Sequence, residues 1–130
     1  MTDEDLKAAF EDGSLPPDVF DHAAHVQLAW VYVHELALPQ AIERFIDGLR
    51  AFTRQHGDEA KYHETISWFF LLLIADRQGK TRAKTYVEFI EANPDLIASS
   101  KAVLSRYYRS ETLAADGARA HFTLPDNFAA

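Results

Sequence analysis

The chain has 130 residues, a formal net charge of −7 and no cysteine. The lack of cysteine excludes disulfides, thiolate metal ligands and cysteine nucleophiles, and it favours the cytoplasm over secretion. Because an acidic surface repels phosphate groups, the charge argues against general binding to nucleic acid and to anionic membranes. The longest uninterrupted apolar run, from Trp68 to Ala75, is far shorter than the about 20 residues needed to span a bilayer. These features predict one soluble domain, residues 1–130.

The first half of the chain predicts three helices, at residues 3–11, 21–38 and 40–55. In the first, Thr2 stands at the expected N-cap, Asp5 follows in the capping-box position, and Gly13 ends the helix. The second is expected to stop before Pro39, because proline lacks the amide hydrogen that a helix interior needs. In the third, apolar residues recur at helical spacing, which indicates a helix that packs on a core through one face.

The fourth predicted helix, residues 58–78, differs from the others. Between Ile66 and Ala75 it is apolar on every side except at Ser67, a pattern that indicates the buried centre of a bundle. Further helical segments are expected at 82–92, in short pieces between 95 and 108, and at 110–122. No stretch alternates between polar and apolar residues as a half-buried strand does. The prediction is an all-α domain, an irregular bundle of about five to six helices around the central helix 58–78.

Three histidines occupy positions where a helical protein normally has apolar residues: His22, His25 and His63. His22 and His25 are three residues apart near the start of the second helix, so both rings project from one face. His63 lies near the start of the fourth helix. A helix N-terminus disfavours a positively charged ring, and a neutral imidazole is the form that binds a metal ion. The three histidines are therefore candidate ligands of a divalent transition metal, with zinc, iron, nickel and copper about equally suited.

Glu64 follows His63 but projects about 100° away around the helix. It is the candidate catalytic residue, either as a fourth metal ligand or as a general base that activates water for hydrolysis. Known metal motifs do not match, because neither His63-Glu64 nor His34-Glu35 is followed by the second histidine of His-Glu-x-x-His. The Glu-x-x-His spacing of di-iron bundles does not occur either. The sequence therefore leaves open whether the protein is an enzyme.

Three other interpretations of the same residues stay open. Histidines near helix starts often only hydrogen-bond free backbone groups, which would make them structural. Alternatively, the histidines line a metal-free pocket for a small acid, walled by aromatic side chains. In the third interpretation the chain is a helical interaction module or a homodimer whose exposed aromatic residues dock on a partner.

Two stretches of the chain resemble a known family. Residues 20–30 read FDHAAHVQLAW and residues 61–70 read KYHETISWFF. These motifs are similar to those of a family of small uncharacterised bacterial helical proteins, which share the patterns FxHxxHVxLAW and KYHETIS. Three shorter segments carry the same resemblance, at residues 93–96, 106–108 and 124–126. The resemblance covers most of the chain, and it implies a bacterial helical protein but no particular reaction or substrate.

Overall fold

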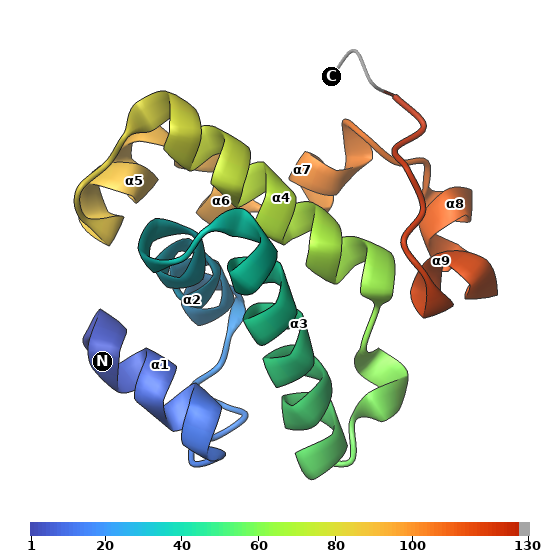
Figure 1. Cartoon of the computed structure of the whole chain (residues 1–130). Coiled ribbons are helices and arrows are strands. Elements are labelled where there is room, and N and C mark those ends of the chain that lie inside the picture. Colours follow the sequence, from blue (N-terminus) through green and yellow to red (C-terminus); the bar gives the residue numbers. More distant parts are fainter. Residues whose placement is uncertain (128–130) are drawn as a thin grey trace.

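The computed structural model describes residues 1–127, and all regular secondary structure in that range is helical (Figure 1). The all-α prediction is therefore confirmed. The α-helices of that range are α1 (Asp3–Asp12), α2 (His22–Glu35), α3 (Leu38–Gln55), α4 (Glu64–Thr81), α5 (Tyr86–Ala92), α6 (Asp95–Ala98), α7 (Ser100–Ser105), α8 (Ser110–Ala114) and α9 (Asp116–Ala120). They outnumber the expected helices partly because Ala115 is extended and divides the last predicted helix into α8 and α9. Among these helices none is both long and apolar enough to cross a membrane.

The first helices begin and end at the capping residues that the sequence indicates. The Thr2 hydroxyl accepts a hydrogen bond from a first-turn amide at 3.1 Å, and Gly13 ends α1 with a φ of 80°, a left-handed conformation that glycine adopts at little energetic cost. The helix predicted over 21–38 ends at Glu35, and α3 follows directly. Pro39 lies in the first turn of α3, where its missing amide hydrogen has no helical partner to lose. Proline therefore helps to start α3, in addition to limiting α2.

The predicted helix 58–78 divides into two pieces. The first is a 3₁₀ turn, η1 (Glu59–Lys61), which is followed by the extended residue Tyr62. The second is α4, and His63 is its N-cap, since the ring Nδ1 accepts a hydrogen bond from the Ile66 amide at 3.2 Å. Arg82, with a φ of 52°, follows the last turn of α4. The start of the central helix is thus defined by the side chain of a candidate site residue.

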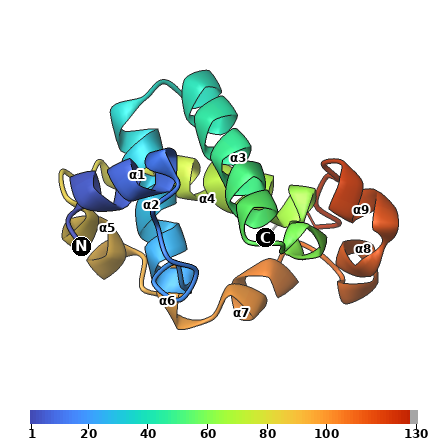
Figure 2. The same cartoon turned by 90° about the horizontal axis from the view of Figure 1, so that it is seen from below.

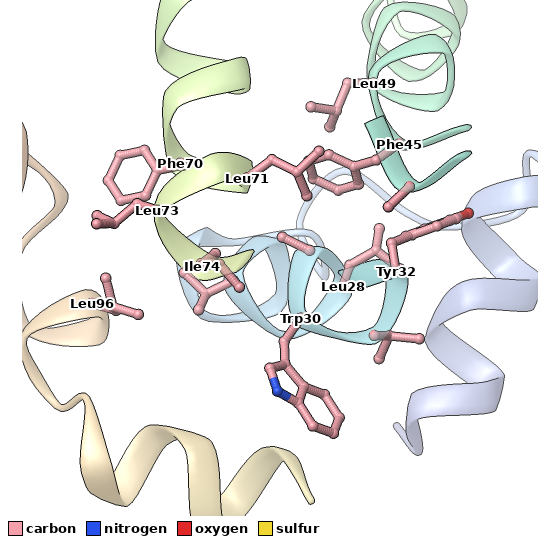
Figure 3. Close-up of a cluster of buried hydrophobic side chains, with 14 of the residues drawn as sticks. Leu28, Trp30, Tyr32, Phe45, Leu49, Phe70, Leu71, Leu73, Ile74 and Leu96 are labelled. Atoms are coloured by element: carbon pink, nitrogen blue, oxygen red, sulfur yellow. The ribbon is translucent and has the colours of Figure 1, made fainter. Parts of the chain in front are cut away.

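Two helices, α2 and α4, pack against each other at the centre of the molecule, and the others surround them (Figures 1 and 2). The sequence indicates one helix buried on all sides, but α2 is buried in the same way. Leu28, Trp30 and Tyr32 of α2 are each at most 2% exposed. Figure 3 shows Leu28 and Tyr32 on the side of α2 that faces Phe45 of α3, and Trp30 pointing away from Phe45 and from Leu71 of α4. Each large apolar side chain buried in this way stabilises the fold by about 1.5–3 kcal/mol. The packing of α2 against α4 therefore fixes the positions of their N-termini, where the candidate histidines lie.

The C-terminal helices α8 and α9 lie beside the start of α4 (Figures 1 and 2). Thr65 of α4 makes the connection, because its buried hydroxyl donates to the Ala118 carbonyl at 2.6 Å and accepts a hydrogen bond from the Thr123 amide at 3.0 Å. This docking brings Arg119 of α9 to η1, where the guanidinium donates to the Ala60 carbonyl at 2.8 Å. A basic residue near the end of the chain is thereby placed next to the region that contains the candidate site.

Candidate functional site

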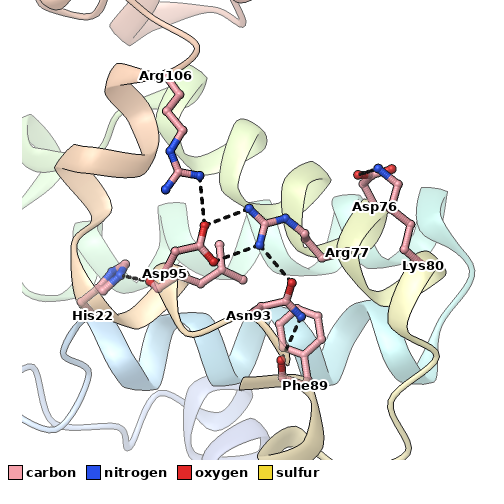
Figure 4. Close-up of polar contacts among 9 residues, drawn as sticks. His22, Asp76, Arg77, Lys80, Phe89, Asn93, Asp95 and Arg106 are labelled. Carbon is pink, nitrogen blue, oxygen red and sulfur yellow. Dashed lines mark hydrogen bonds and ion pairs between the residues drawn. The ribbon is translucent and has the colours of Figure 1, made fainter. Parts of the chain in front are cut away.

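His22, the first residue of α2, is tied to α6. Its Nε2 atom lies 2.7 Å from the Leu96 carbonyl oxygen (Figure 4). Because a carbonyl oxygen only accepts hydrogen bonds, Nε2 carries the proton and donates it. The ring also packs edge-on against Phe70, with the ring centroids 5.9 Å apart. His22 therefore joins two helices, and its Nε2 atom is already in use.

His63 uses both of its ring nitrogens. Nδ1 accepts the hydrogen bond from the Ile66 amide, and Nε2 donates to the Leu113 carbonyl of α8 at 2.8 Å. These two contacts select a neutral ring with its proton on Nε2. The side chain is only 8% exposed. A metal ion could bind His63 only after one of the two hydrogen bonds had broken.

Among the three candidate histidines, His25 is the one whose ring has no hydrogen-bond partner within residues 1–127. Phe20 stacks on its ring at a centroid distance of 5.5 Å, and Phe45 packs edge-on at 5.3 Å. Burial, with a smaller contribution from His22, lowers the pKa of His25 to about 4. The ring is therefore neutral at neutral pH and keeps one donor and one acceptor nitrogen.

A hollow of about 500 Å³ opens between the start of α2, the end of α3 and the start of α4. We call it the histidine pocket, and two histidines line it among aromatic and apolar side chains: Phe20, His25, Phe52, Tyr62, His63 and Ile66. Thr53, Ser67 and an ion pair between Lys61 and Asp58 add polar groups to the wall. His25 also lines a second hollow, of about 300 Å³, together with His22. The structure thus brings His25 close to both other histidines, but in two different hollows.

Glu64 does not line the histidine pocket. Its carboxylate accepts a hydrogen bond from the Tyr62 hydroxyl and forms an ion pair with Arg50 of α3 at 2.5 Å. It borders a third hollow, of about 420 Å³, which we call the arginine hollow because Arg50, Arg54 and Arg119 all line it. The residue expected to act as a general base is therefore held in an ion pair, in a hollow other than the one that contains His25 and His63.

Within residues 1–127, no group of three or more histidine, aspartate or glutamate side chains is arranged to hold a metal ion. The candidate set of His22, His25, His63 and Glu64 is instead spread over three hollows. The assignment of a zinc, iron, nickel or copper site to these residues stays a prediction. It requires His63 to exchange a hydrogen bond that the structure shows for a metal ligand bond.

Comparisons with known protein families, with curated proteins and with solved structures find no match to this chain. The function of the candidate site is therefore inferred from the geometry and chemistry of its own residues. Sequence reasoning did not single out Arg54 and Arg119, which the fold brings to the arginine hollow from α3 and α9. Their meeting depends on how α9 docks on α4, which no local pattern of residues encodes.

Proposed function

We propose that the protein binds a small organic ligand in the histidine pocket, without a metal ion. The observation that carries the proposal is the half-buried His25 ring, which has no hydrogen-bond partner within residues 1–127. Neither ring nitrogen of His25 belongs to the fully buried side-chain atoms without a partner, which in the described residues are His56 Nε2 and Trp68 Nε1. The His25 nitrogens are therefore accessible to a molecule that enters from outside and can hydrogen-bond it. A ligand in the pocket would supply that partner.

The size and lining of the pocket support a ligand with an apolar body. Its volume of about 500 Å³ falls in the range of roughly 300–1,000 Å³ that is typical of small-molecule sites. Phe20 and Phe52 contact each other edge-to-face in its wall, with centroids 5.0 Å apart, so a flat ring would find aromatic surfaces to pack against. The neutral His25 ring would then hydrogen-bond a polar substituent. The ligand class is an aromatic or otherwise apolar molecule that carries a polar group.

The proposed function is ligand binding, and the proposed location of the protein is the bacterial cytoplasm. Glu64, the residue expected to activate water, is paired with Arg50 in the arginine hollow, which favours binding over hydrolysis. The lack of cysteine supports a reducing compartment, and the resemblance of the two histidine motifs to bacterial proteins supports the source.

Isothermal titration calorimetry with neutral aromatic probes, 4-phenylbutanamide and 2-naphthamide, tests the proposal. We expect saturable binding to the wild-type protein and affinity about tenfold lower for His25→Leu, which keeps an apolar side chain but lacks both ring nitrogens. His34→Leu, which changes an exposed histidine further along α2, is the matched control and should bind as the wild type does. Equal affinity of the wild type and a folded His25→Leu variant, or no binding of either probe, would overturn the proposal.

A further inference from the structure

The arginine hollow concentrates positive charge in a protein whose net charge is −7. Arg50 and Arg54 reach it from the C-terminal part of α3, and Arg119 reaches it from α9. The carboxylates in its wall are those of Glu59 and Glu64. Three guanidinium groups against two carboxylates leave one excess formal positive charge in the lining of a hollow of about 420 Å³.

The three arginines differ in how far the protein already uses them. Arg50 is held in its ion pair and lies over the Tyr62 ring, with Cζ 5.7 Å from the ring centroid. Arg119 donates through one nitrogen, Nη1, to the carbonyls of Ala60 and Tyr62 at 2.8 and 3.3 Å. Arg54 forms no ion pair or hydrogen bond through its side chain with any residue of the described range 1–127. Neither Arg54 nor Arg119 has a carboxylate partner within residues 1–127, so the excess charge is shared by these two guanidinium groups.

The arginine hollow and the histidine pocket adjoin each other. Thr53 and Tyr62 line both of them. Burial raises the pKa of the Tyr62 hydroxyl, which therefore stays protonated and donates to Glu64. This hydrogen bond holds the Tyr62 side chain in place at the boundary between the two hollows, with Arg50 over its ring.

We infer that the ligand of the histidine pocket is a carboxylate monoanion whose acid group lies in the arginine hollow, with Arg54 and Arg119 as its binding residues. The inference rests on the proposed function and adds the charge class of the ligand. One excess positive charge matches a monoanion, and a planar guanidinium can hold both oxygens of a carboxylate at once. A phosphate dianion would exceed the charge that the hollow offers.

A matched pair of probes, 4-phenylbutanoate and 4-phenylbutanamide, isolates the contribution of the acid group. Calorimetry at one low ionic strength should show the carboxylate binding about tenfold more tightly than the amide, since salt screens such exposed pairs. Arg54→Gln should abolish this preference by lowering the affinity for the carboxylate about tenfold. Arg82→Gln removes the same charge at an exposed arginine that lines none of the three hollows, and it should keep the preference.

The outcomes separate this inference from the function on which it rests. If the wild type binds acid and amide equally, or if the preference survives in Arg54→Gln, the inference is overturned and the histidine pocket takes neutral ligands. If the carboxylate binds with an affinity that His25→Leu does not change, while the amide does not bind at all, the proposed function fails and the arginine hollow alone binds the anion. Both arginines to be substituted are exposed, and thermal melting confirms that each variant is folded.

Discussion

The regions around the two ends of α4 differ in how completely their polar side chains are paired. Near the C-terminal end, Arg77 donates two parallel hydrogen bonds to Asp95 at 3.0 and 2.9 Å, and Arg106 donates a third at 3.1 Å (Figure 4). Near the N-terminal end, the ring of His25 and the guanidinium of Arg54 have no polar partner within residues 1–127. Both regions contain paired groups, such as His63 and Glu64 near the N-terminal end, but among the described residues only there do unpaired groups, His25 and Arg54, line a hollow beside them.

The paired region holds the fold together. Arg77 also donates to the Asn93 side-chain oxygen at 2.9 Å, and the Asn93 side-chain nitrogen donates to the Phe89 carbonyl at 2.9 Å, so the network connects α4 with α5 and α6. Asn93, Asp95 and Arg106 have a structural role in this network. Groups available to a ligand are therefore expected at the other end of α4, where they are left unpaired.

The largest expected effect is the loss of the paired region. Asp95→Ala should lower the free energy of unfolding by about 3 kcal/mol, because it leaves the partly buried Arg77 without its charged partner. The hydrogen bonds from Arg77 lower the pKa of Asp95 to about 2, so the carboxylate is charged at neutral pH. Asp76→Ala, which breaks an exposed pair with Lys80, should cost less than about 0.5 kcal/mol. Urea unfolding at pH 7 measures both, and equal losses would contradict the structural role of Asp95.

In the unpaired region, His25 should make the protein less stable in mild acid. Its pKa in the folded protein, about 4, lies below the unfolded value of 6.5, so between these values the unfolded chain binds the proton more readily. The stability that depends on the neutral ring is complete above about pH 6.5 and falls by about 2 kcal/mol between pH 7 and pH 5.

Urea unfolding at pH 5, 6 and 7 measures this dependence on pH. His25→Gln should flatten it, whereas His121→Gln, which changes an exposed histidine, should leave it as in the wild type. A slope of the same size in His25→Gln would show that another group titrates, and the description of His25 as a half-buried neutral ring would be wrong.

His63 should behave as a structural cap, although it lines the same pocket as His25. His63→Ala should lower the free energy of unfolding by about 1–2 kcal/mol, because α4 loses its N-cap and α8 loses the hydrogen bond to Leu113. His63→Asn should recover part of this, since asparagine caps helices well. The rate of hydrogen exchange at the Ile66 amide reports directly on the hydrogen bond to the capping side chain. Equal exchange rates in the two variants would contradict the capping role.

The smallest expected effect is that of added metal. With both nitrogens of His63 and one of His22 in hydrogen bonds, zinc, iron, nickel or copper should raise the melting temperature by less than about 1 °C. Elemental analysis of the untagged protein, purified without chelator or nickel resin, provides the second measurement. A near-stoichiometric metal that disappears in a folded double variant, His22→Ala with His63→Ala, would establish the metal site and remove the contrast between paired and unpaired histidines.

Much of the fold could be predicted because its signals lie within a few residues of each other. Thr2 and Gly13 mark the start and the end of α1, and the apolar run of α4 predicts a buried helix. Each of the three predicted histidines lines one of two hollows around His25, and their role as a binding site stays a prediction. Which histidine remains unpaired could not be predicted, because it depends on carbonyl groups supplied by distant helices.

The role of Glu64 shows the same limit. Its place beside His63 in the sequence suggested a shared site, but His63 is an extended N-cap while Glu64 begins the helix. Their side chains consequently meet different partners, the Leu113 carbonyl for His63 and the Arg50 guanidinium for Glu64. The side chains of adjacent residues can point in different directions at a helix start. The packing of α3 and α8 around α4 then decides which group each side chain meets.

The most direct test of the account is NMR of the protein with ¹³C-labelled histidine rings, titrated with 4-phenylbutanamide. The six histidines report separately on the pocket, the structural contacts and the surface. We predict saturable shifts of the His25 ring signals, with the exposed His34 and His121 unchanged. If the His25 signals do not move while the protein is folded, or if His34 and His121 move as much as His25, the histidine pocket is not the ligand site.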